Sequence, residues 1–432
     1  MTHVKSKGGI TLRHGIAIYV ASVLGGGILV LPGLAADTAG PASIIAWVVL
    51  SVASYPLAYT FSRLALRSKG SGGIYSFSLE AFGTTLGNGV GWLFLAWVVL
   101  GGPAVAVAAG SYLSYAVPIS RVGIYLVAFL LLLTGAVINY IGIRFSANFQ
   151  LIIIVMLLSL LGISIITAGT RISDSEFVPF FTESSLGPLG TAIALVIWAY
   201  FGYENVPNMA GDFSNLQKDM SRSVTYSVII IGVLYTSLSI VTVGTGAYKS
   251  GNGLVPFAVI LDGVFGVYGR FAAGIIAIVA IFSAMNAYTA GVSRVIQTVS
   301  KNGGLPKMFS GESEINGAPG NAIILVLVLS SVFLSAYWFF NVSVELAFLV
   351  VSGIGVVTYI IGSAAGIKLL ELKGWRKAIP WVSLAISAII VIFIGKLMIF
   401  AILVITASLL YTFTIGHMRK YRNDIPIFRR SG

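Results

Sequence analysis

Long apolar stretches constrain this chain more than any other feature of its sequence. A helix that crosses a lipid bilayer needs about 20 mostly apolar residues, and stretches of that length recur along the whole chain. They are too long, and too apolar on every face, for amphipathic core helices or for the strands of a membrane barrel. We therefore predict an all-α membrane protein with twelve transmembrane helices, near residues 12–39, 41–66, 86–118, 121–141, 146–168, 188–213, 222–247, 267–300, 319–340, 344–367, 378–395 and 397–416.

The composition excludes a water-soluble protein. Hydrophobic residues make up 57% of the chain and charged residues only 9%, with a mean hydropathy of +0.97, whereas soluble domains carry about 25% charged residues. The net charge of +12 is typical of cationic loops on one side of a membrane, so no nucleic-acid partner is expected. The chain has no cysteine, and its three histidines lie near its ends. Disulfides, thiol chemistry and an internal metal site are therefore not expected.

The lysines and arginines predict the orientation. With the N-terminus inside and twelve spans, the inner segments hold 21 of the 26 Lys and Arg residues. Such residues are enriched in cytoplasmic loops. We expect a multi-pass protein of the cell membrane, in contact with the lipid bilayer, with both termini in the cytoplasm.

The first predicted span is interrupted near its middle. Gly25, Gly26 and Gly27 follow one another, and Pro32 comes five residues later. Consecutive glycines impose little backbone restriction, and proline can begin a new helical segment. Freed backbone groups inside a bilayer must be satisfied by protein, water or a ligand. The run predicts a broken helix that serves a binding site, although a simple kink or close helix packing would also fit.

The sixth predicted span carries a second interruption. Gly202, Glu204 and Pro207 lie within six residues of one another. Glu204 is the one acidic residue that the span assignment places deep in the membrane, and such a carboxylate indicates a functional site.

Breaks in spans one and six are typical of two inverted repeats whose interrupted first helices face each other. The N-terminal ends of half-helices attract anions. The carboxylate of an amino acid suits the glycine run, and its ammonium suits carbonyl oxygens at the sixth-span break. The expected organisation is an N-terminal tail with the first repeat over 1–168, the second repeat over 188–367, two additional helices over 378–416 and a basic tail over 417–432.

Four segments in chain order resemble motifs of the amino acid–polyamine–organocation (APC) superfamily of transporters. Residues 24–28 resemble its glycine-rich G-x-G substrate loop, and residues 69–77 resemble its P/S-x-S-G-G-x-Y region. Residues 201–219 resemble the sixth span with the charged loop after it. Residues 283–287 with 301–306 resemble the S-x-x-N and K-D-G-x-L-P region at the eighth span.

The resemblance implies a LeuT-type fold, with ten spans in two inverted repeats plus two more, and alternating access around a central amino-acid site. Residues 31–35, 139–150 and 202–204 are most similar to bacterial exporters of methionine and branched-chain amino acids. One departure concerns the fifth span, where some family members carry a lysine at a former sodium site. Leu157 occupies that position here, and residues 146–168 contain no lysine. Sodium coupling, proton coupling through Glu204 and simple exchange all stay open.

The candidate substrate-binding residues are those at the two breaks and on the third and eighth spans. Each of these residues also has a purely structural interpretation. The hydroxyl of Ser22 could bond to its own helix, Asn286 could form an interhelical bond, and Pro103 with Ala104 could form a packing kink. By resemblance, Phe201 closes over the substrate as a gate. The alternative for Phe201 is an ordinary aromatic contact in the core. Protonation of Glu204 could couple to opening, and the alternative for this residue is a permanently bonded structural glutamate. The full set is Ser22, Gly25, Gly26, Gly27, Ile28, Pro103, Ala104, Phe201, Gly202, Tyr203 and Asn286, with Phe201 and Glu204 for gating or proton coupling.

These features predict a secondary active transporter that moves a neutral, apolar L-amino acid by alternating access. The few charges near the predicted site disfavour a polyamine or basic amino-acid carrier, which is the alternative within the fold. A channel is the alternative from another class. No enzyme is expected, because the interior offers no nucleophile, base or metal cluster. No cofactor is expected beyond a coupling ion, H⁺ or Na⁺, and the oligomeric state stays open.

Overall fold

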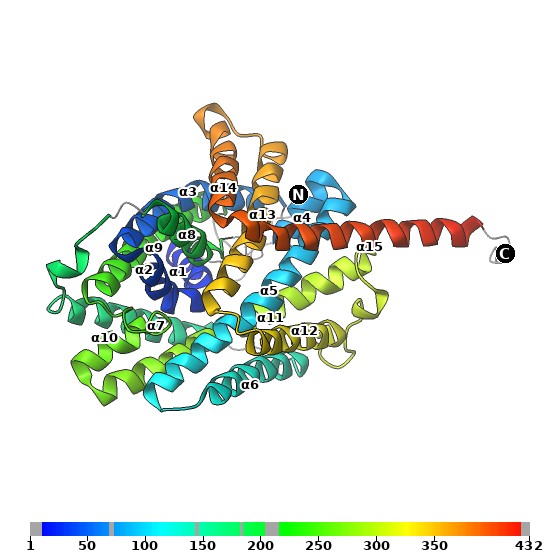
Figure 1. The fold of residues 1–432 in the computed structure, drawn as a ribbon. Coiled ribbons are helices and arrows are strands. Elements are labelled where there is room, and N and C mark those ends of the chain that lie inside the picture. The colour runs from blue at the N-terminus through cyan, green and yellow to red at the C-terminus, as the bar shows by residue number, and fades with distance from the viewer. Residues whose placement is uncertain (1–10, 69–72, 143–146, 182–184, 204–215, 425–432) are drawn as a thin grey trace.

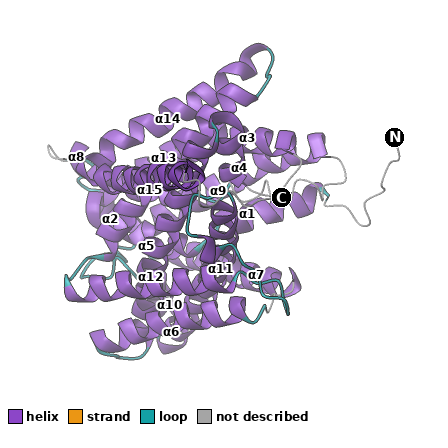
Figure 2. Cartoon of the chain, turned by 90° about the vertical axis from the view of Figure 1, so that its right-hand side faces the viewer, coloured by secondary structure: helices purple, strands orange, loops and turns teal. Residues whose placement is uncertain are grey.

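The computed structural model describes residues 11–68, 73–142, 147–181, 185–203 and 216–424, and within these ranges every regular element is a helix (Figures 1 and 2). The α-helices are α1 Leu12–Val23, α2 Leu31–Ala39, α3 Ser43–Ser68, α4 Gly73–Phe82, α5 Thr84–Ala116, α6 Arg121–Tyr140, α7 Ala147–Ala168, α8 Leu186–Val196, α9 Leu216–Gly244, α10 Pro256–Phe265, α11 Val267–Lys301, α12 Gly320–Phe339, α13 Val344–Leu369, α14 Ile379–Ile394 and α15 Met398–Asp424. Short 3₁₀ turns connect several of them, namely η1 Gly26–Leu29, η2 Gly40–Ala42, η3 Asp174–Phe177, η4 Ile197–Tyr200, η6 Lys307–Phe309, η7 Gly374–Ala378 and η8 Gly395–Leu397.

Eight helical stretches are long and apolar enough to cross a membrane, counted over the described ranges. Two of them extend over the boundary between two predicted spans. One covers residues 31–67 and bends at Gly40, whose φ of 56° is a conformation that glycine adopts without strain. The other covers residues 374–414 and bends in the same way at Gly395 (φ 58°). The chain is therefore an all-helical membrane protein, and the count of twelve spans stays a prediction.

The predicted boundaries of the long central spans agree with the helices within a few residues. In the sixth predicted span, α8 begins at Leu186 and continues through η4 to Tyr200, where the helical conformation ends. Residues 204–213 of the predicted range lie outside the described residues. The sequence pattern did not predict α10 as a helix between the seventh and eighth spans, because its 10 residues are too few for a membrane crossing.

The core of the bundle lies around α1, α2, α5, α8, α9, α11 and α13, where one continuous cluster of buried side chains connects all of them. Many hydroxyl groups in this core bond to backbone carbonyls one turn away or to a neighbouring helix. Thr60 on α3, for example, donates to Pro56 and lies 2.9 Å from the hydroxyl of Ser383 on α14. Such bonds satisfy polar side chains where no water is present.

The two ends of the bundle can be told apart by their loops. Gly33 lies on α2, just ahead of α3, and Gly253 lies in the segment after α9. The backbones of these two glycines pack against each other, so the start of α3 and the end of α9 lie at the same end of the bundle. On that side Lys249 pairs with Glu176 at 2.6 Å. At the opposite end of α3, Arg67 donates to the carbonyl oxygen of a residue at the end of α13 at 2.6 Å. The loops at this end of the bundle are rich in the Lys and Arg residues that are predicted to face the cytoplasm.

Candidate functional site

The glycine run in the first span interrupts the helix, as the sequence predicts. Helix α1 ends at Val23, and Gly25 is fully extended (φ −83°, ψ −175°). One 3₁₀ turn follows, and α2 then begins at Leu31 with Pro32 in its first turn. A Cβ built on Gly26 would lie 2.8 Å from a side-chain carbon of Ile281 on α11, whereas one built on Gly25 would meet nothing within 4 Å. Gly26 therefore permits close packing, and Gly25 borders open space.

The sixth span also leaves the helical conformation. Helix α8 tightens into η4, and Phe201 is already extended (φ −77°, ψ 147°). Gly202 has a φ of 132°, which residues with a side chain rarely adopt. Glu204, the predicted coupling residue, lies outside the described residues together with Pro207, so its role stays a prediction.

The two breaks touch through their backbones. The hydroxyl of Ser22 donates to the carbonyl oxygen of Gly202 at 2.7 Å. A Cβ on Gly202 would lie 2.9 Å from the carbonyl carbon of Ser22 and 3.0 Å from the Cα of Val23. Real side chains do not tolerate such distances, so this approach of the two chains requires glycine.

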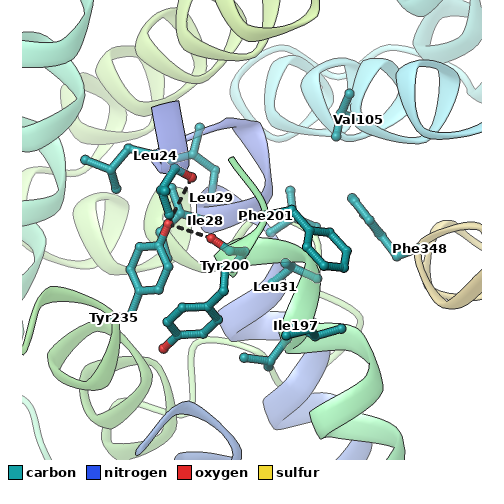
Figure 3. Packing of buried hydrophobic residues seen from close by; sticks show 14 of the residues in the cluster. Leu24, Ile28, Leu29, Leu31, Val105, Ile197, Tyr200, Phe201, Tyr235 and Phe348 are labelled. Carbon is teal, nitrogen blue, oxygen red and sulfur yellow. Dashed lines mark hydrogen bonds between the residues drawn. The ribbon is translucent and has the colours of Figure 1, made fainter. Parts of the chain in front are cut away.

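One tyrosine joins the ends of both half-helices. The buried hydroxyl of Tyr235 on α9 lies 3.2 Å from the carbonyl oxygen of Val23 and 3.1 Å from that of Ala199 (Figure 3). The Tyr235 ring packs edge-on against Trp47 and Tyr200, with centroids 5.3 Å away in both cases. A single O–H donates to one of the two carbonyls at a time, so Tyr235 links the ends of the two half-helices, and the Val23 carbonyl also accepts from the Gly25 amide at 2.7 Å.

A cavity of about 60 Å³ lies where the two breaks meet α5 and α11. Among the described residues that line it there is no charged side chain. Its walls are glycine backbone, aliphatic side chains and aromatic rings, with a few hydroxyl groups. The lining residues are Val23, Gly25, Gly26, Gly27, Ile28, Trp97, Val98, Gly101, Gly102, Val105, Leu132, Trp198, Ala199, Phe201, Ile281, Ala284, Met285, Tyr288, Thr289 and Ser330.

The first break offers hydrogen-bond donors beside this cavity. Gly26 and Gly27 open the 3₁₀ turn, and the first amides of a helix have no acceptor within it. Within the described ranges, no backbone carbonyl accepts a hydrogen bond from the N–H groups of Gly26 and Gly27. The cavity wall therefore carries two available donors in a region without a fixed charge. Such donors suit an anion.

Phe201 forms the aromatic side of the cavity. Its ring contacts Trp97 edge-on at a centroid distance of 4.9 Å and lies 4.8 Å from the ring of Tyr359 on α13. A Cβ on Gly355 would lie 2.7 Å from the Phe201 Cζ, so this glycine leaves room for the ring. Figure 3 shows Phe201 and the preceding Tyr200 pointing to different sides of the chain. The ring is thus positioned by α5 and α13 beside the cavity.

Five of the predicted binding residues line the cavity, namely Gly25, Gly26, Gly27, Ile28 and Phe201. The others lie nearby with different contacts. Ser22 and Gly202 bond to each other, as described above. Tyr203 is fully buried with its ring centroid 6.3 Å from that of Tyr19 on α1.

The predicted residues on the third and eighth spans do not line the cavity. Asn286 accepts a bond of 2.8 Å from the side chain of Asn139 on α6, which makes it an interhelical contact. Pro103 and Ala104 are buried on another face of α5, where Ala104 packs in a cluster with Tyr337 of α12. The wall from α5 consists instead of residues just before and after them, because helical rotation turns adjacent positions to different sides.

Sequence reasoning missed Trp97, Gly101, Gly102, Trp198 and Tyr288, all of which line the cavity. A signal was present in the glycine pair beside Pro103, but the pattern could not say which side of the helix faced the site. Among the described residues, no group of three or more His, Asp or Glu side chains could hold a metal ion.

Comparisons with known proteins identify the family of this chain. A family model described as amino acid permease matches residues 10–417. The chain belongs to this family. The permease family is part of the APC group, and its members are transporters rather than enzymes.

Individual relatives cover most of the permease. The uncharacterized amino acid permease YecA of Bacillus subtilis is 29% identical over 95% of this chain and 97% of its own length. The L-methionine/branched-chain amino acid exporter YjeH of Escherichia coli is 27% identical over 83% of this chain and 86% of its own. The putrescine transporter PotE of Haemophilus influenzae is 25% identical over 82% of this chain and 83% of its own. The relatives therefore include carriers of neutral and of cationic substrates.

Proposed function

We propose that this permease is a secondary active transporter of a neutral, apolar L-amino acid, which it carries by alternating access. The observation that carries the proposal is the cavity at the meeting point of the two helix breaks, with free amides on one wall and apolar side chains on the others. An amino acid has a charged head and a side chain that differs between substrates. The site provides one region for each.

The substrate carboxylate would bind the N–H groups of Gly26 and Gly27. The ammonium group would bind the carbonyl oxygen of Ala199 at the end of the second half-helix. The Val23 carbonyl oxygen already accepts from Tyr235 and from the Gly25 amide, whereas the Ala199 carbonyl oxygen has a second lone pair beside its bond from Tyr235. Both helix ends carry the partial negative charge of a helix C-terminus, which favours a cation.

A neutral side chain fits the remaining walls better than a cationic one. A charged amine buried among Trp97, Val98 and Val105 without a carboxylate would cost several kcal/mol, and the described lining residues include no carboxylate. The 27% identity with the methionine and branched-chain exporter supports a neutral substrate. A polyamine or basic amino-acid carrier is the second candidate, and the 25% identity with the putrescine transporter favours it.

The proposal includes twelve spans, with α1–α2 and α8 as the broken first helices of two inverted repeats and both termini in the cytoplasm of a cell-membrane protein. The contact between the two breaks supports the repeat assignment, since interrupted helices of inverted repeats face each other. The distribution of 21 of 26 Lys and Arg residues to inner segments supports the orientation. Phe201 would act as the gate of the cavity.

The coupling ion is H⁺ or Na⁺, or exchange proceeds without one. Leu157, at the position where the family resemblance implies a lysine in some members, is buried on α7, so a built-in cation is not expected there. Glu204 is the proposed proton-coupling group. A pH dependence that disappears in Glu204→Gln, with no effect of sodium, would support proton coupling.

Counterflow in proteoliposomes tests the proposed function. Vesicles preloaded with a neutral amino acid should accumulate the labelled compound transiently, which a channel cannot do. We expect leucine, methionine or another neutral apolar amino acid to support counterflow and putrescine or arginine to fail. Counterflow with diamines alone would overturn the neutral substrate, and unsaturable flux without counterflow would overturn the carrier.

A matched pair of glycine variants locates the site. Gly25→Ala adds a methyl group beside the cavity without a clash, and the extended backbone at Gly25 accepts alanine. Gly162→Ala on α7 also adds a methyl without a contact within 4 Å, but away from the cavity. We expect Gly25→Ala to lower the apparent affinity and Gly162→Ala to leave it unchanged. Equal effects would place the substrate elsewhere.

A further inference from the structure

The face that α5 presents to the breaks has two adjacent rows of residues. Trp97, Gly101 and Val105 follow one another at intervals of four and meet the sixth-span break, where Trp97 packs against Phe201. Val98 and Gly102 form the next row, also at an interval of four. Positions one residue apart on a helix differ by about 100° in direction. The second row therefore faces away from the breaks, toward the neighbouring helices of α5.

The cavity extends along this second row. Besides the residues at the breaks, it is lined by Leu132 of α6, Thr289 of α11 and Ser330 of α12. The helices α6, α11 and α12 all pack against α5. The part of the cavity beside Gly102 is thus bounded by α5, α6, α11 and α12, and we call this part the arm.

Gly102 keeps this arm open. A Cβ on Gly102 would lie 3.7 Å from the Leu132 Cδ2, an ordinary contact distance, with no other heavy atom within 4 Å. In the first row, by contrast, a Cβ on Gly101 would lie 3.0 Å from the Trp198 Cη2, a tight contact that the Trp198 ring would have to relieve by a small shift. A methyl group at position 102 would therefore occupy free space in the arm without displacing its surroundings.

We propose that this arm is a subsite for the substrate's side chain and that it selects an unbranched apolar chain. The proposal rests on the proposed function, because it assumes an amino acid whose carboxylate lies at the glycine run. The cavity, of about 60 Å³, is narrow, and a side chain that starts at the glycine run must pass the first row of α5 to reach Gly102 in the second. A linear chain with several rotatable bonds can follow such a path, whereas a β-branched chain is stiff at χ1 and wide next to Cα.

The end of the arm adds a second preference. Thr289 and Ser330 bring two hydroxyl groups to a region otherwise walled by Leu132 and Met285. A thioether sulfur is a weak hydrogen-bond acceptor and a methylene group is not. The arm therefore favours a thioether side chain over an alkyl chain of the same length.

Competition for counterflow by the full-length protein in proteoliposomes tests the subsite. The probes are methionine and norleucine as linear chains, isoleucine as a β-branched chain and alanine as a short one. Wild type should prefer methionine and norleucine to isoleucine. In Gly102→Ala the apparent KM for the two linear substrates should rise roughly 10- to 200-fold, as one extra methyl group does in an apolar pocket, while that for alanine changes less than about twofold. Gly162→Ala is the matched control and should alter none of them.

Ser330→Ala tests the end of the arm. We expect it to reduce the preference for methionine over norleucine by about twofold or more, the range for one weak hydrogen bond, with the KM for alanine unchanged. Wild-type preference for isoleucine, or an equal rise of all four KM values in Gly102→Ala, would overturn the subsite while leaving an amino-acid transporter. Failure of every amino acid to support counterflow in wild type would instead overturn the proposed function.

Discussion

Replacing Tyr235 with phenylalanine tests how the two helix breaks are held together. The change removes one hydroxyl and keeps the ring that packs against Trp47 and Tyr200. The hydroxyl is the donor shared by the carbonyl oxygens of Val23 and Ala199. Its loss leaves buried acceptors without this partner, which costs about 1–3 kcal/mol. If the bond holds the two halves of the binding site in the binding geometry, restoring that geometry when the substrate binds costs up to this energy in its absence.

The expected result is a roughly 5- to 150-fold rise in the apparent KM for the transported amino acid, the equivalent of that energy. Counterflow in proteoliposomes measures it. Tyr337→Phe is the matched control, because the Tyr337 hydroxyl also donates to a buried carbonyl, that of Leu100 at 2.9 Å, but joins α12 to α5 instead of the two breaks. Both variants should lower the melting temperature. The reasoning is refuted if Tyr235→Phe and Tyr337→Phe lower the melting temperature equally and neither changes KM.

Three further predictions follow from close contacts and one ion pair. Gly202→Ala should fail to fold stably, because its Cβ would meet the backbone of α1 and its φ of 132° disfavours a side chain; normal yield and melting temperature in detergent would contradict this. Gly355→Ala should displace the Phe201 ring, 2.7 Å from the new Cβ, and should reduce counterflow more than melting temperature; unchanged transport would argue against Phe201 as the gate. The hydrogen bond from Lys301 lowers the pKa of Glu312 below its usual 4.5. The ion pair therefore stabilises the fold above the ordinary pKa of a glutamate, and this stabilisation is lost as the pH falls through the lowered pKa of Glu312. The melting temperatures of wild type and Glu312→Gln should accordingly differ at pH 7 and converge in acid.

The sequence predicted the elements that are set by local chemistry. Long apolar runs must form helices in a bilayer, and the breaks at Gly25–Gly27 and at Gly202 follow from the absence of side chains at those positions. The family resemblance, carried by motifs at these same breaks, is confirmed by the match over residues 10–417. These features need no knowledge of how distant helices pack.

The sequence could not predict features that depend on which face of a helix meets which neighbour. Pro103 and Ala104 were expected in the cavity wall, yet their neighbours Gly101 and Gly102 line it, because one step along a helix turns the side chain by about 100°. Asn286 was expected at the substrate and instead accepts a bond from Asn139, 147 residues away in the chain. Such long-range pairs follow from tertiary packing, which local patterns do not encode.

Protection of a single cysteine in the cavity tests the central claim most directly. The chain has no native cysteine, so Ala284→Cys introduces one thiol on the cavity lining, and Glu314→Cys introduces one in an exposed loop as a control. The account predicts that a neutral apolar amino acid slows maleimide labelling at position 284 but not at position 314, and that adding Gly25→Ala removes the protection. Labelling at position 284 that is unaffected by any amino acid that supports counterflow would contradict it.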